Sequence, residues 1–156
     1  MTEWINQMSQ PNYIQRIESA RNGTNPAVIC QVPSGWVFLA NMQYLCGYCI
    51  LQADPIVESL NALVQKEREQ YLRDMALVGD ALLEVTNAYR INYATLGNTE
   101  PVLHTHIVPR YLDEPDEFRA NGPWSYPQEY QASIIFNYER DRELMESICA
   151  AIQKRL

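Results

Sequence analysis

Hydrophobic positions fall into short β-rich runs in the first third of the chain and into a helical stripe in its middle. The runs cover 28–32, 36–40 and 48–52, and Pro33-Ser34-Gly35 offers good hairpin chemistry between the first two. Two further strands are predicted at 89–94 and 102–110. The first three runs indicate an antiparallel meander, to which the later strands are added.

Apolar residues at spacings of three and four predict helices over 11–21, within 55–88 and over 138–155. The middle helix carries an apolar stripe that should cover one face of a sheet: Leu60, Leu63, Tyr71, Met75, Val78, Leu82 and Val85. Its charged residues are interpreted as the solvent-facing side: Lys66, Glu67, Arg68, Glu69, Arg73 and Asp74. The order of strands, helices, strands and a terminal helix indicates an α+β fold.

The segment 111–131 is irregular, acidic and interrupted by prolines. It is predicted to be a surface loop that folds back on the domain. Within it, Trp124 is a candidate for a lid over a binding site or for an anchor of its own loop.

Length and charge narrow the class of protein. A chain of 156 residues suits one domain with a sizeable core. No stretch is apolar for long enough to span a bilayer, and residues 1–23 lack the continuous apolar stretch of a secretory signal, so we expect a cytoplasmic protein that does not enter a membrane. The net charge of −7 opposes non-specific nucleic-acid binding, which needs a basic surface.

Four cysteines raise the question of a metal site or a disulfide. Cys46 and Cys49 have the spacing of both, but they lie among β-forming residues, where an odd separation places them on opposite faces of a strand. Cys30 and Cys149 have no matching pair motif. Free thiols are the favoured interpretation for all four.

The only two histidines, His104 and His106, lie two residues apart in a predicted strand. Side chains alternate across a strand, so both imidazoles should share a face with Val102 and lie roughly 6 to 7 Å apart. That spacing suits one bound phosphate or one bound ion. It also suits two buried histidines whose nitrogens are satisfied within the fold.

The surroundings of the histidines favour the phosphate. Residues 92–111 closely resemble the signature of the histidine triad (HIT) superfamily of nucleotide hydrolases and transferases, in which three histidines alternate with apolar residues, often before Pro-Arg. The resemblance covers about 27–111. It implies a histidine-triad-like antiparallel sheet of about five strands with a long helix packed on it. We expect a single domain spanning 1–156, with a C-terminal helix that also packs on the sheet. The N-terminal helical extension and the C-terminal loop plus helix fall outside the part of the chain that carries the resemblance.

The resemblance implies a role for each matching residue. His104 falls on the nucleophile that attacks the α-phosphate, and His106 falls on the histidine that contacts the phosphate or the leaving group. Three residues fall on substrate-binding positions. Asn92 matches the phosphate-side asparagine, Asn98 stands where glutamine is more usual, and Thr99 matches the Ser/Thr near the leaving-group oxygen.

Val102 occupies the place of the first histidine of the triad. The nucleophile needs one free ring nitrogen and a hydrogen bond at the other nitrogen to fix its tautomer. A backbone carbonyl could supply that bond, and valine retains one. Valine in place of the first histidine is therefore expected to affect the rate of turnover, because the loss of a supporting side chain leaves the catalytic residues less firmly positioned.

We expect a hydrolase or transferase that cleaves a nucleoside phosphate anhydride or phosphoramidate, such as a dinucleoside polyphosphate, through a nucleotidyl intermediate on His104. The scheme requires no metal and no cofactor, and the resemblance also implies a homodimer. One alternative is a nucleotide-binding or adaptor module with little catalysis. Another is a metal-dependent hydrolase, although no third ligand stands at a recognisable spacing. Trp36 and Phe38 are candidates for lining a base pocket, although aromatic residues on a strand are more often core.

Overall fold

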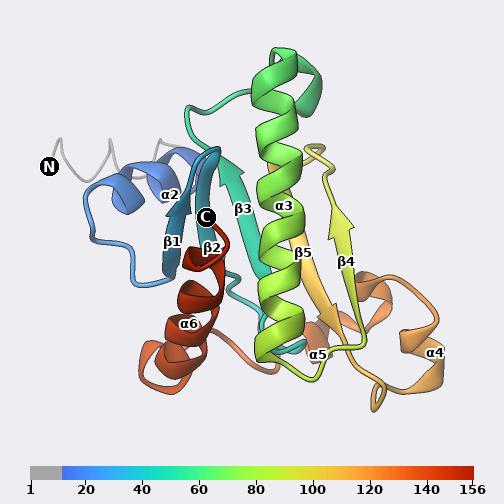
Figure 1. Ribbon diagram of the computed structural model, residues 1–156. Helices are drawn as coiled ribbons and strands as arrows, with labels where there is room; N and C mark the ends of the chain where they lie inside the picture. Colours follow the sequence, from blue (N-terminus) through green and yellow to red (C-terminus); the bar gives the residue numbers. More distant parts are fainter. Residues whose placement is uncertain (1–11) are drawn as a thin grey trace, which may run out of the picture.

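The computed structural model describes residues 12–156, which form a five-stranded sheet in the order β1-β2-β3-β5-β4 (Figure 1). Every neighbouring pair of strands is antiparallel. The strands are β1 (Val28–Val32), β2 (Gly35–Leu39), β3 (Cys49–Ala53), β4 (Arg90–Ala94) and β5 (His104–Arg110). The predicted α+β class and five-stranded antiparallel sheet are confirmed.

Three longer helices accompany the sheet in the described part of the chain: α2 (Asn12–Arg21), α3 (Gln65–Val85) and α6 (Tyr138–Gln153). The expected start of the first helix, at Pro11, lies outside the described residues. No helix within residues 12–156 combines the length and the apolar character needed to cross a bilayer.

The middle helix is shorter than the sequence predicted. The chain from Pro55 to Val64 contains only one 3-10 turn, η1 (Leu60–Ala62), because the backbone is extended at Leu63 and Val64 and cannot form helical hydrogen bonds there. Leu60 and Leu63 still pack against the core, although they do so from outside the helix.

Asp74 corrects the expectation that all the charged residues of α3 face solvent. It is 1% exposed. One carboxylate oxygen accepts the backbone N–H of Ser34 at 2.8 Å, and the other accepts the side-chain amide of Gln70 at 2.8 Å. Buried carboxylates are retained when they are hydrogen-bonded, and this one ties the β1–β2 hairpin to the long helix.

The cysteines are free thiols in the described residues. Cys46 is exposed and lies in a turn before β3, whereas Cys49 is buried and begins that strand. The expectation that both lie on one strand was wrong, because Gly47 between them has a φ of 90°. Glycine adopts such a backbone conformation without the strain that a side chain would cause.

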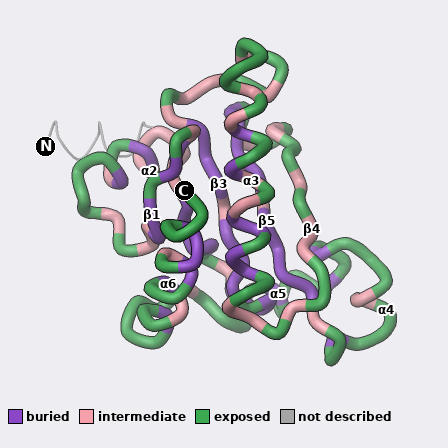
Figure 2. The backbone as a smooth tube through the Cα atoms, in the orientation of Figure 1, coloured by how far each residue is buried: buried purple, intermediate pink, exposed green. Residues whose placement is uncertain are grey.

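The long helices α3 and α6 cover one face of the sheet (Figure 1). The main apolar cluster lies between them and the strands, and includes Val37, Leu51, Ile107, Tyr71, Leu82, Ile148 and Ile152. Figure 2 shows that the central strands are buried, whereas the edge strand β4 is half-buried or exposed. Burial of this apolar surface is the main favourable contribution to folding.

Two segments cover parts of the opposite face. The helix α2 packs Ile17 and Ala20 against Phe38 of β2. The segment 111–131 folds back as predicted, with short helices α4 (Asp116–Arg119), η2 (Pro123–Ser125) and α5 (Gln128–Gln131) inside it. Between these two covers, part of the face formed by β3 and β5 is left open.

Arg110, the last residue of β5, anchors this returning segment. Its guanidinium and Glu114 are almost fully buried and form an ion pair at 3.0 Å. The remaining N–H groups donate to the side chain of Asn92 and to the backbone carbonyls of Phe118 and Asn121. Glu114 also accepts the hydroxyl of Tyr126 at 2.7 Å. One fully hydrogen-bonded charge pair therefore fixes the course of the loop.

We expect Glu114→Gln to lower the free energy of unfolding by about 3 to 5 kcal/mol, because it leaves the Arg110 charge buried without a countercharge. Asp116→Asn is the matched control, since Asp116 pairs with Arg119 but its side chain is 92% exposed. The control should change stability by no more than about 0.5 kcal/mol. Urea denaturation of the variants measures both values, and equal effects would show that the buried pair has no special role.

Candidate active site

Both histidines lie on β5 and face the open part of the sheet. In the pairing with β3, His104 lies opposite Gln52 and His106 lies opposite Ile50. The ring centroids of the two histidines are 5.1 Å apart. Between them, Thr105 points to the other face, where its hydroxyl lies 2.8 Å from the hydroxyl of Tyr71 on α3. The strand alternation predicted from the sequence is confirmed.

The backbone carbonyl of Val102 fixes the tautomer of His104. Its oxygen lies 2.9 Å from Nδ1 of the buried His104 ring. A carbonyl can only accept, so Nδ1 carries the proton and Nε2 keeps its lone pair. Val102 itself is buried and lies two residues before the observed start of β5, although the sequence predicted that the strand begins at this residue. The backbone carbonyl that valine retains therefore forms the hydrogen bond that the nucleophile needs.

His106 is held as a neutral imidazole. Burial, together with the neighbouring His104, lowers its pKa from 6.5 to about 4. Its Nδ1 lies 2.6 Å from the hydroxyl of Tyr48, and burial raises the pKa of that phenol well above its ordinary value. A protonated phenol donates to Nδ1, which leaves the proton of His106 on Nε2. The ring of Trp124 lies edge-on to His106 at 5.1 Å.

The histidines line a cleft of about 340 Å³. The predicted substrate-binding residues Asn98 and Thr99 line the same cleft, in the connection between β4 and β5. Gly97 in this connection has a φ of 75°, which favours glycine. Trp124 of η2 also lines the cleft, so the returning segment forms part of its wall. The remaining lining residues are Arg16, Ile50, Leu96, Gly97 and Glu100.

Other predicted residues are placed elsewhere. Asn92 lies on the same face of the sheet, but its side chain accepts a hydrogen bond from Arg110 at 2.7 Å, and it does not line the cleft. Phe38 lies under α2, and Trp36 donates its indole N–H to Asp54 at 2.9 Å. The two aromatic residues belong to the packing of α2 rather than to the cleft.

The sequence indicated no role for three residues in or beside the cleft: Arg16 and Glu100, which line it, and Gln52, which contacts Arg16. A carboxylate oxygen of Glu100 lies 4.0 Å from Nε2 of His104. Arg16 donates to Glu100 and also to the side-chain oxygen of Gln52. Gln52, a polar residue in an otherwise apolar strand, offered a signal of a buried polar partner. Arg16 gave none, because 84 residues separate it from Glu100.

Within residues 12–156, no three His, Cys, Asp or Glu side chains are grouped in a way that could hold a metal ion.

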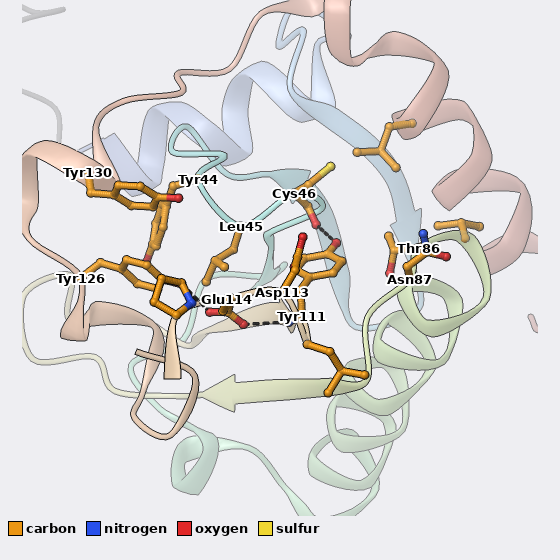
Figure 3. Close-up of a pocket in the computed structure, with 14 residues that line it drawn as sticks. Tyr44, Leu45, Cys46, Thr86, Asn87, Tyr111, Asp113, Glu114, Tyr126 and Tyr130 are labelled. Atoms are coloured by element: carbon orange, nitrogen blue, oxygen red, sulfur yellow. Dashed lines mark hydrogen bonds between the residues drawn. The ribbon is translucent and has the colours of Figure 1, made fainter. Parts of the chain in front are cut away.

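A larger groove of about 730 Å³ lies between the segment 111–131 and the start of β3, and Figure 3 shows its tyrosine-rich wall. Burial raises the pKa values of Tyr44 and Tyr111 to about 12. The groove wall desolvates the thiol of Cys46 and raises its pKa as well, although the residue reaches solvent. The two histidines line the smaller cleft and not this groove, so the smaller cleft is the better candidate for catalysis.

Solved structures share the fold of this chain. A histidine triad protein from Sinorhizobium meliloti 1021 superposes with a TM-score of 0.65 at 21% identity, over 83% of this chain and 88% of that one. A histidine triad protein from Marinobacter aquaeolei VT8 gives a TM-score of 0.68 at 17% identity, over 90% and 94%. The chain has the histidine triad fold.

A third similar structure is that of an enzyme. The diadenosine triphosphate hydrolase of Plasmodium falciparum gives a TM-score of 0.55 at 18% identity, over 84% of this chain and 79% of that one. No protein-family model matches the sequence, and no curated protein matches it significantly. At these identities the comparisons establish the fold, and the activity has to be argued from the site.

We expect nitrogen NMR to find His104 protonated at Nδ1 and His106 protonated at Nε2. His106 should stay neutral at pH 6 and titrate near pH 4. Its lowered pKa means that the unfolded chain takes up this proton first, so the stabilisation is present above pH 6.5 and is lost as the pH falls toward 4. A His106 midpoint near 6.5, or the opposite tautomer at His104, would contradict the described hydrogen bonds.

Proposed function

We propose that the protein is a nucleotide hydrolase or transferase that acts through a covalent nucleotidyl intermediate on His104. The observation that carries the proposal is the orientation of this ring, whose Nδ1 is bonded to the carbonyl of Val102 while Nε2 keeps a free lone pair beside the cleft. A histidine nucleophile needs this combination. The histidine triad fold supports the same substrate class.

In the first step, Nε2 of His104 attacks the α-phosphate of a nucleoside phosphate anhydride or phosphoramidate. A phosphorus–nitrogen bond forms, and the bond to the leaving group breaks, with its electron pair on the leaving atom. In the second step, water attacks the same phosphorus, and His104 departs with the electron pair of the broken bond. The products are the leaving group and a nucleoside monophosphate, and dinucleoside polyphosphates are the proposed substrates.

The remaining site residues position the phosphate and the leaving group. His106 offers an Nε2–H donor, because its Nδ1 accepts the hydroxyl of Tyr48 and the proton of the neutral ring is then on Nε2. Asn98 and Thr99 line the cleft and offer an amide and a hydroxyl to phosphate or leaving-group oxygens. Fixed donors of this kind account for most of the catalysis of phosphoryl transfer. Asn92 contributes indirectly, through its bond to Arg110.

A second candidate function follows from Val102, which replaces the first histidine of the triad. A nucleotide-binding or adaptor module would keep the cleft and have little turnover. The intact hydrogen bond from His104 to the carbonyl of Val102 favours the enzyme, because the tautomer does not depend on the missing side chain.

We also propose a homodimer formed through β4, which lies at the edge of the sheet and carries the exposed Tyr93. An edge strand presents unpaired backbone groups that a second copy can bond. The cytoplasmic location stays a prediction.

The test is release of nucleoside monophosphate from a panel of dinucleoside polyphosphates and nucleoside phosphoramidates, with and without chelator. His104→Ala should abolish turnover, because it removes the proposed nucleophile. His106→Ala is the comparison variant and should retain turnover slowed by about a hundredfold, the contribution of one proton-donating group. Chelator should change neither result.

Three other results of this assay would contradict the proposed mechanism. Turnover by His104→Ala at the native rate would exclude a covalent intermediate on His104. Loss of activity in chelator would favour the metal-dependent hydrolase. Nucleotide binding by the native chain without turnover on any substrate would favour the adaptor module.

A further inference from the structure

Arg16 reaches the cleft from α2, outside the part of the chain that resembles the histidine triad signature. Its Nη1 donates to the side-chain oxygen of Gln52 at 2.8 Å and to Glu100 at 3.2 Å. Its Nη2 donates to the other carboxylate oxygen of Glu100 at 3.1 Å. The guanidinium thus forms a two-pronged pair with a carboxylate that itself lies 4.0 Å from Nε2 of His104.

Only one positively charged side chain among the described lining residues, Arg16, can pair with a phosphate bound in the cleft. Among the described lining residues, Arg16 is the only arginine or lysine and Glu100 is the only carboxylate. His106 carries no charge near neutral pH, since burial lowers its pKa to about 4. A phosphate that approaches Nε2 of His104 therefore meets the negative charge of Glu100 unless a cation compensates for it.

Gln52 holds the guanidinium at the cleft independently of Glu100. Its side chain is fully buried, and its amide N–H donates to the backbone carbonyl of Tyr13 at 3.0 Å. The amide oxygen is then fixed as an acceptor for Nη1 of Arg16. Exchange of Glu100 for another anion would not require Arg16 to leave this position.

We propose that Arg16 is a substrate-binding residue, and that the phosphate of the substrate displaces Glu100 from its guanidinium. A planar guanidinium binds phosphate and carboxylate oxygens with the same two-pronged geometry, so one anion can replace the other. In the free protein the carboxylate of Glu100 pairs with the guanidinium of Arg16, beside the proposed nucleophile His104. In the complex Arg16 contacts the phosphate and Glu100 turns away. This inference rests on the proposed function and adds its phosphate-binding cation.

The position of Arg16 at the cleft is not needed to attach α2 to the sheet. The helix is already held by Ile17 and Ala20, which pack against Phe38. It is also held by Arg21, whose Nε donates to Asp54 at 3.0 Å. Arg21 lies on the same helix, forms the same kind of pair and does not line the cleft, which makes it a matched control.

The experiment is calorimetric titration of the native chain and its variants with the common ribonucleoside 5′-monophosphates and with the corresponding nucleosides. Arg16→Gln should weaken monophosphate binding by about tenfold or more, the effect of losing a charged hydrogen-bonding partner, and leave nucleoside binding unchanged. Glu100→Gln should strengthen monophosphate binding, because it removes the competing carboxylate. Arg21→Gln should behave like the native chain.

The double variant separates a direct contact from simple neutralisation of Glu100. In the Glu100→Gln background, Arg16→Gln should still weaken monophosphate binding by about tenfold if the guanidinium contacts the phosphate. If Arg16 only neutralised the carboxylate, the second substitution would change nothing, and the proposal would fall.

Two further results would also overturn it. Weaker binding in both Arg16→Gln and Glu100→Gln, or an equal loss in Arg21→Gln, would show that the pair only attaches the helix. Failure of the native chain to bind any monophosphate would overturn the proposed function together with this inference. Binding by the native chain with unaltered variants would overturn the inference alone.

Discussion

The alternation of side chains along β5 is the constraint on which the site depends. One set of residues on this strand faces α3 and the apolar core, and Thr105 with Ile107 belongs to it. The other set, His104 and His106, faces the cleft. Because the side-chain period is two, a shift of one residue would bury both imidazoles in the core and expose the core residues. The packing that stabilises the sheet therefore also sets the direction of the proposed nucleophile.

Backbone and neighbouring side chains then decide what each imidazole can do. The carbonyl of Val102 keeps Nε2 of His104 free, and the hydroxyl of Tyr48 keeps Nε2–H on His106. One ring is left as a lone-pair donor and the other as a hydrogen-bond donor, although both are of the same residue type. This division does not use a third histidine, which is why valine at position 102 is compatible with the proposed chemistry.

Sequence patterns predicted the parts of the molecule that depend on local periodicity. The five strands and the alternation around His104 follow from runs of β-forming residues. The resemblance to the histidine triad signature placed Asn98 and Thr99 near the histidines, and both line the same cleft. Two of the failures came from long-range contacts. Asp74 was assigned to solvent, yet it binds a turn 40 residues earlier in the chain. The pair of Arg16 and Glu100 joins an N-terminal helix to a distant loop, and no spacing in the sequence indicates such a contact.

The most direct test of the proposed mechanism is to trap the covalent nucleotidyl intermediate on His104. The native protein is mixed with a dinucleoside polyphosphate, quenched in alkali, which preserves phosphorus–nitrogen bonds, and digested for mass spectrometry. The covalent mechanism predicts one nucleoside monophosphate group attached to His104, with none on His106. Turnover without any adduct, or an adduct on a residue other than His104, would contradict it.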